Sequence, residues 1–338
     1  MKKNFLIFLI TSLTIVFLTT AIHAQNELVV MTWGGSWGDS LKRNIAEPFQ
    51  KEFAVKVTIV NQLNNRDGLN KVIAQKDNPQ VDVWTADVAS HSLAANHGLL
   101  EEVAESKIPN LKYSQIKGTK NSVNWYILNP GIFYAADKTP FALKSWEDLW
   151  DARLKGKVAV PDATYCSGQF LVVAALIAGG SEYKIQPAFD KLEKLKPNIA
   201  MFFKTDSESI KFLESGEASV AAMGLLPNVY SLLGKGSKYK FVIPEKPQLA
   251  INDNVAILKG RKNTALAYKF VNYMLSTKAQ EAHCASIGTA PVNREAKAPA
   301  AMADIVPKQL KNLYEINFDE VNKNLAEWTE IYNKRIKQ

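Results

Sequence analysis

The hydrophobic pattern at the N-terminus of the chain differs from the pattern everywhere else. Lysines at positions 2 and 3 precede an apolar run at 5–10 and a second, largely apolar run at 13–18 that Thr14 interrupts, and this stretch ends at the small residue Ala24. A charged start, a short apolar core and a small residue before a polar segment are typical of a secretory signal peptide. We therefore predict a cleaved signal peptide over residues 1–24 and a protein that diffuses freely in the periplasm. A retained membrane anchor is the alternative.

Beyond residue 25, short apolar runs alternate with segments of helical periodicity. The pattern predicts strands at 28–31, 55–60 and 81–84, and helices at 39–53, 69–74 and 90–96. Alternation of this kind is typical of a parallel or mixed sheet with helices on both faces.

A second strand–helix series follows an extended aromatic segment at 121–136. It predicts strands at 158–160, 199–203, 218–222 and 239–243, and helices at 169–178, 183–195 and 206–215, with Asp206 as the N-cap of the last. A second extended segment, 249–258, precedes a helix at 265–275. The part after Pro299 is predicted to be helical and polar.

These two blocks predict two lobes joined by a hinge. Removal of 24 residues from 338 leaves 314, which exceeds the size at which a single hydrophobic core keeps growing. We assign residues 25–128 and 254–298 to the first lobe, and residues 129–253 and 299–338 to the second. The hinge is expected at 128–131 and 250–255, with a ligand cleft between the lobes.

Charge and cysteine content narrow the function classes. The 41 Lys and Arg residues outnumber the 33 Asp and Glu residues, but no run of five basic residues marks a nucleic-acid surface. The only cysteines, Cys166 and Cys284, fall in different predicted lobes. We expect both to be small buried residues, and a disulfide between them is the alternative.

The sequence offers no catalytic constellation. After the signal peptide it has three histidines; His91 and His97 face different sides of a helix, and His283 stands alone beside Cys284. The H-E-x-x-H, G-x-S-x-G and C-x-x-C motifs do not occur. We therefore expect neither an enzyme nor a cofactor or metal centre, and an exported enzyme remains a minor alternative.

Candidate ligand-binding residues follow the ends of predicted strands, where open α/β sheets bind ligands. Trp33 and Trp37 flank glycines, among them Gly35, that allow close approach of a ligand, and both tryptophans could equally be core residues. Asp87 follows the third strand and is expected as a helix N-cap, a ligand contact or both.

The second lobe and the hinge supply the other candidates. Tyr165 and Ser167 lie between a strand and a helix, where backbone N–H groups favour an anionic or polar group. Asn129 and Asp253 lie at the predicted hinge, and we expect Asp253 to contact the ligand.

Several short segments carry a resemblance to a known family through their order and spacing. They are residues 47–53 with 55–57, 81–83, 97–100, 145–150 with 155–157, 252–257, 267–275 and 287–288. Together they resemble the periplasmic solute-binding proteins of ABC importers, in the group that includes the spermidine/putrescine-binding proteins. The resemblance implies a type II periplasmic-binding-protein fold, an ABC permease of the inner membrane as partner, and a monomer.

The resemblance also suggests roles for three side chains. In polyamine-binding members, aromatic rings sandwich the methylene chain and acidic residues hold the amines; Trp33 and Asp253 match such positions, and Asp87 falls in a ligand-contacting loop. The second-lobe acid of those proteins has no evident counterpart, and Ile251 replaces an aromatic residue. A buried ammonium needs a partner.

The hypothesis is therefore a ligand with one cationic nitrogen near Trp33, Asp87 and Asp253, and with a polar or anionic end near residues 164–168. A polyamine is the alternative within the class. A ferric-iron receptor is less favoured because the tyrosines are dispersed.

Overall fold

The computed structural model describes residues 26–234, 236–249, 251–299 and 313–338. The predicted signal peptide, position 250 of the predicted hinge and residues 300–312 of the predicted C-terminal helical part lie outside these ranges. Within the described ranges, no helix is both long and apolar enough to cross a membrane.

The first lobe is built on a five-stranded mixed sheet with the order β2-β1-β3-β11-β4. β1 runs parallel to β2 and β3, whereas β11 runs antiparallel to β3 and β4. The strands are β1 (Glu27–Trp33), β2 (Lys56–Gln62), β3 (Val83–Asp87), β4 (Val123–Leu128) and β11 (Ile251–Ile257). Short 3₁₀ turns, Glu105–Lys107 and Pro109–Tyr113, precede β4.

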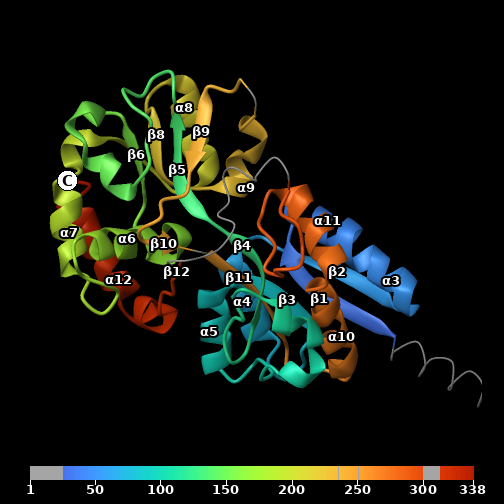
Figure 1. The fold of residues 1–338 in the computed structure, drawn as a ribbon. Helices are drawn as coiled ribbons and strands as arrows, with labels where there is room; N and C mark the ends of the chain where they lie inside the picture. The colour runs from blue at the N-terminus through green and yellow to red at the C-terminus, as the bar shows by residue number, and fades with distance from the viewer. Residues whose placement is uncertain (1–25, 235, 250, 300–312) are drawn as a thin grey trace, which may run out of the picture.

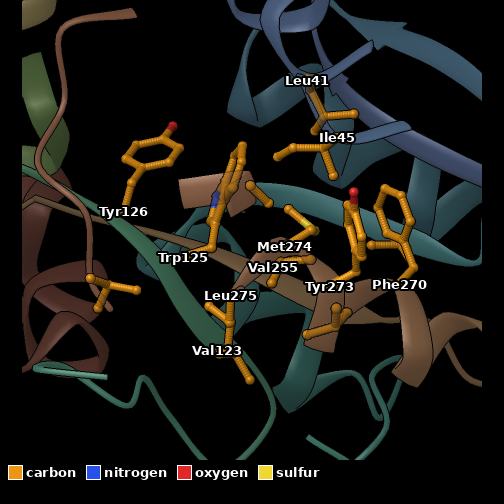
Figure 2. Close-up of a cluster of buried hydrophobic side chains, with 14 of the residues drawn as sticks. Leu41, Ile45, Val123, Trp125, Tyr126, Val255, Phe270, Tyr273, Met274 and Leu275 are labelled. Atoms are coloured by element: carbon orange, nitrogen blue, oxygen red, sulfur yellow. The ribbon is translucent and has the colours of Figure 1, made fainter. Parts of the chain in front are cut away.

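Helices cover both faces of this sheet. They are α2 (Gly35–Leu41), the π-helix Lys42–Ala46, α3 (Glu47–Phe53), α4 (Asn65–Ala74), α5 (Val88–Asn96), α10 (Thr264–Met274) and α11 (Thr277–Ile287). The predicted helix 39–53 therefore begins earlier, at Gly35, and α11 was not predicted. Figure 2 shows the core that these helices make with β4: Trp125 lies in one cluster with Leu41, Ile45, and Phe270 and Met274 of α10.

The second lobe repeats the plan with the order β7-β6-β8-β5-β9, in which β6 is parallel to β7 and β8, and β5 is antiparallel to β8 and β9. The strands are β5 (Pro130–Ala135), β6 (Val158–Pro161), β7 (Ile199–Phe203), β8 (Val220–Leu225) and β9 (Tyr239–Val242). The helices are α6 (Gln169–Ile177), α7 (Gln186–Glu193), α8 (Asp206–Ser215), α9 (Leu226–Val229) and α12 (Phe318–Arg335), with 3₁₀ turns at Trp146–Trp150, Ala152–Leu154, Tyr165–Gly168, Lys196–Asn198 and Tyr230–Leu232.

The first crossing from one sheet to the other takes a single residue. β4 ends at Leu128 and β5 begins at Pro130, so that the predicted extended segment 121–136 is two strands of different sheets separated by Asn129. The return passes through β10 (Gln248–Leu249), which pairs in parallel with β12 (Leu313–Tyr314), before β11. In Figure 1 the first lobe lies below the second, and α12 packs on the second lobe although it ends the chain. The residue boundaries of the two lobes stay a prediction.

Two local predictions have clear outcomes. Thr205, not Asp206, is the N-cap of α8: it forms a capping box with Glu208, so the N-cap prediction for Asp206 was wrong. Both cysteines are free in the structure, Cys284 buried and Cys166 half-buried, so that no disulfide joins the lobes.

Candidate ligand-binding site

A cavity of about 530 Å³ lies between the lobes, at the ends of strands from both sheets. Five of the eight predicted site residues line it: Trp33, Trp37, Asp87, Ser167 and Asp253. The volume is within the range of pockets that enclose small organic ligands. The strand-end rule therefore predicted residues that line this cavity, and their binding role stays a prediction.

The first lobe contributes an aromatic wall. The ring centroids of Trp33 and Trp37 are 6.1 Å apart, and those of Trp37 and Tyr126 are 5.6 Å apart. The indole N–H of Trp33 donates to Oδ1 of Asn65 at 3.1 Å, which fixes the ring. Trp37 lines the cavity and also packs against the first-lobe core.

Two carboxylates lie side by side beneath this wall. Asp87 on β3 and Asp253 on β11 are direct partners in the antiparallel register, which places their side chains on one face of the sheet at a Cβ separation of about 5 Å. Asp253 is only 7% exposed, and the Tyr126 hydroxyl donates to its Oδ2 at 2.7 Å. Burial raises the pKa of Asp253 to about 7, and the charge of Asp87 adds to this, while the Tyr126 hydrogen bond works against it. A neighbouring cation would therefore stabilise the ionised form of Asp253.

Asp87 has two structural partners as well as a place in the cavity. Its Oδ1 accepts from the backbone N–H of Ser90 at 2.8 Å and caps α5, as one of the sequence-based alternatives predicted. Its Oδ2 accepts from the Ser167 hydroxyl at 3.3 Å. Ser167 belongs to the second lobe, so this bond crosses the cleft.

The second-lobe wall begins at a strained turn. Cys166, Ser167 and Gly168 all have left-handed backbone, with φ of 48°, 55° and 79°. Two non-glycine residues in this region carry a conformational cost, and such strain tends to occur at functional sites. Burial raises the pKa of the Cys166 thiol well above its usual value, and the charge of Asp206 adds to this effect. The thiol is therefore protonated at neutral pH.

Three predicted site residues do not line the cavity. Gly35, with φ of 63°, is exposed and borders a separate groove beside α2. Asn129 is buried at the crossing between the lobes, where its Nδ2 donates to the carbonyl of Leu249 at 3.4 Å. Tyr165 packs edge-on against Phe203 in the second lobe, with centroids 5.2 Å apart.

The structure adds lining residues that sequence reasoning missed. Asn65, Gln169 and Asn228 each follow the end of a strand or its loop, so stricter use of the strand-end rule would have found them. Phe318 also lines the cavity, but it comes from the far end of the chain and had no local signal. Among the described residues no lysine or arginine lines the cavity, and no group of three or more His, Cys, Asp or Glu side chains is arranged to hold a metal.

Comparison with known proteins shows which family this chain matches. A model of the bacterial extracellular solute-binding protein family matches residues 44–308. The spermidine/putrescine-binding periplasmic protein 1 of Haemophilus influenzae is 28% identical over 294 residues, which are 82% of this chain and 78% of that protein. The gamma-aminobutyric acid-binding protein of Pseudomonas aeruginosa is 25% identical over 312 residues, 87% of this chain and 85% of that protein.

A solved structure gives the same result for the fold. The crystal structure of an ABC transporter from Clostridium perfringens matches with a TM-score of 0.81 at 30% identity, covering 91% of this chain and 99% of that one. The prediction of a two-lobe type II periplasmic-binding-protein fold, with mixed sheets flanked by helices, is confirmed. Family model, relatives and fold agree: this chain belongs to the bacterial extracellular solute-binding protein family, as the substrate-binding protein of an ABC transporter.

Proposed function

We propose that the cavity captures a small amine-containing solute, cationic or zwitterionic, with its ammonium group at Asp87 and Asp253 beside Trp33. The observation that carries this proposal is the pair of adjacent carboxylates in a cavity that no described basic side chain lines. A buried carboxyl group is costly to ionise alone, and a ligand cation supplies the missing partner. The indole of Trp33 offers a flat face for the cation or its methylene groups.

Membership of the family supports the rest of the proposed transport cycle. The protein, exported by its predicted signal peptide, acts as a monomer in the periplasm. The lobes close on the solute through a hinge at 128–131 and 250–255, and the closed form delivers the solute to an inner-membrane permease. Members of the family are solute-binding components of transporters, which supports a binding role without catalysis.

A polyamine is the second candidate ligand. It is favoured by the name of the Haemophilus relative and by the presence of two carboxylates at one end of the cavity. A solute with one ammonium group would use the same two carboxylates. The two candidate ligands therefore differ in the part of the molecule that lies away from Asp87 and Asp253.

A thermal-shift screen tests the proposal. The panel contains polyamines, betaines, amino acid conjugates, aminophosphonates and thiamine; a ligand at 100 times its Kd adds about 2.7 kcal/mol to the free energy of unfolding. Asp253→Asn should abolish the response to a cationic ligand. The control is Asp77→Asn, which removes an exposed carboxylate of the same lobe and should respond like the wild type. A response confined to uncharged or anionic solutes would contradict the proposal.

A further inference from the structure

Tyr126 is a buried tyrosine that reaches the proposed amine site from outside the cavity. It is not among the residues that line the cavity, but it lies on β4 directly opposite Asp253 of β11, and its hydroxyl donates to Oδ2 of Asp253 at 2.7 Å. The next residue pair of the two strands is Asn254 with Asn124, so that Trp125 is an extra residue in β4, as in a β-bulge. Bulges redirect neighbouring side chains and are common beside functional sites.

Aromatic rings hold the Tyr126 side chain in place. Its ring centroid lies 4.4 Å from that of Trp125, 5.6 Å from that of Trp37 and 5.6 Å from that of His283 on α11. Figure 2 shows the rings of Tyr126 and Trp125 side by side on β4. Because the side chain is fully buried among these rings, its hydroxyl has a fixed place relative to the sheet.

The Tyr126 hydroxyl is the one donor that the described residues provide to the Asp253 carboxyl group. Because Oδ2 accepts this bond, Oδ1 keeps both of its lone pairs for a ligand. The bond also favours the charged form of Asp253, which burial and the charge of Asp87 disfavour. A single hydroxyl thus affects both the orientation and the charge of this carboxyl group.

We propose that Tyr126 is a positioning residue of the amine-binding site, whose hydroxyl orients the Asp253 carboxylate toward the ligand and helps to keep it charged. The inference rests on the proposed function, since it takes Asp253 to hold the ligand ammonium. It also links the two walls of the site, because Trp37 packs on the ring whose hydroxyl holds Asp253.

The histidines, the tyrosine and the thiol packed around Asp253 keep one charge state between pH 5.5 and 8.5. Burial lowers the pKa of His283, against the Tyr126 ring, and of His91 on α5 to about 3, so both are neutral. Burial raises the pKa of Tyr126 and of the Cys166 thiol well above their usual values, so both stay protonated. Protons released in this range when an amine binds are therefore expected to come from Asp253.

Isothermal titration calorimetry with 1,4-diaminobutane and with 4-aminobutanoate between pH 5.5 and 8.5 tests the inference. The wild-type affinity should rise with pH and level off above about pH 7. Tyr126→Phe keeps the ring and removes the bond, which should move this break upward by about one pH unit and weaken binding about tenfold at pH 6. A purely structural role would reduce the affinity by the same factor at every pH.

The number of protons released on binding gives a second readout. Titration at pH 7 in buffers of different ionisation enthalpy should show release of about half a proton by the wild type and nearly one by Tyr126→Phe. Asp253→Asn should bind neither amine. The control is Tyr268→Phe, which removes a 2.7 Å bond from a buried hydroxyl to the carbonyl of Glu102 in the same lobe and should match the wild type in both readouts.

A third variant keeps the hydroxyl. 3-Fluorotyrosine at position 126 is a stronger hydrogen-bond donor of nearly the same size, so it should move the break to lower pH. An unmoved break in this variant would overturn the inference even if Tyr126→Phe failed to fold.

The outcomes separate the inference from the function on which it rests. If the amines bind but folded Tyr126→Phe, as checked by circular dichroism, keeps the wild-type break and proton release, the role of Tyr126 is refuted and the amine-binding function stands. If neither amine binds to the wild type, the proposed function fails for both amines and the inference fails with it.

Discussion

The raised pKa of Asp253 predicts that this residue destabilises the ligand-free protein at neutral and alkaline pH. Its pKa is about 7 in the folded state, against an ordinary value of 3.8. Between these two values the folded state binds more protons than the unfolded state, so the free energy of unfolding falls as pH rises from 3.8 to 7. Above pH 7 the loss is complete.

The size of this effect follows from the same two values. A pKa difference of about 3, at ~1.36 kcal/mol for each pKa unit, gives a cost of roughly 4 kcal/mol above pH 7. Asp253→Asn removes the ionisable group but keeps an oxygen that can accept from the Tyr126 hydroxyl. We therefore expect the variant to be more stable than the wild type at pH 8, by up to ~4 kcal/mol, and the advantage to fade toward pH 4.

Urea unfolding of ligand-free wild type and Asp253→Asn at pH 4, 5, 6, 7 and 8 measures this difference directly. The difference in the free energy of unfolding should grow between pH 4 and 7 and then stay level. A difference that is the same at every pH would refute the reasoning, because it would mean that Asp253 has an ordinary pKa in the folded protein. A variant that binds ligand like the wild type would separately contradict its proposed role in the site.

Three further predictions use other parts of the structure. The affinity for a cationic ligand should fall about tenfold for each pH unit below 7, as Asp253 takes up a proton, and a pH-independent Kd would contradict this. Trp33→Ala should weaken binding of the same ligand by about tenfold through loss of the indole face, which calorimetry measures. Arg261→Met should cost about 3–5 kcal/mol in urea unfolding, because it leaves the buried Asp82 carboxylate without the guanidinium now 2.7 Å away; a loss below ~1 kcal/mol would show that the pair contributes little.

The strand–helix alternation was enough to predict the fold class, because each strand of the two sheets has its own apolar run and most helices have a marked apolar face. What the pattern could not show is that the extended segment 121–136 changes sheets at Asn129. Hydrophobicity is continuous across that position, since both strands are fully buried. The crossing depends on pairing with distant strands, and no local signal records it.

The candidate site was partly predictable for a related reason. Trp33 and Asp87 are the last residues of β1 and β3, Ser167 lies in the loop after β6, and these strand ends meet at the cavity. Tyr165 lies in the same loop as Ser167 but turns into the second-lobe core, because the left-handed turn at 166–168 redirects the chain between them. Positive φ at two non-glycine residues cannot be inferred from residue type.

Three hydrogen bonds join the two lobes beside the cavity. Ser167 donates to Asp87, Nδ2 of Asn322 on α12 donates to the carbonyl of Ala89 on α5 at 3.3 Å, and Ser92 donates to Asp319. These contacts join Asp87 and α5 of the first lobe to the second lobe.

A ligand shifts the balance between open and closed forms only through contacts that differ between the two forms. Trp33, Asp87 and Asp253 all lie on the sheet of the first lobe, and the proposed function places the ligand amine there. Discrimination among amines therefore has to come from the second-lobe side chains that reach the ligand when the lobes meet.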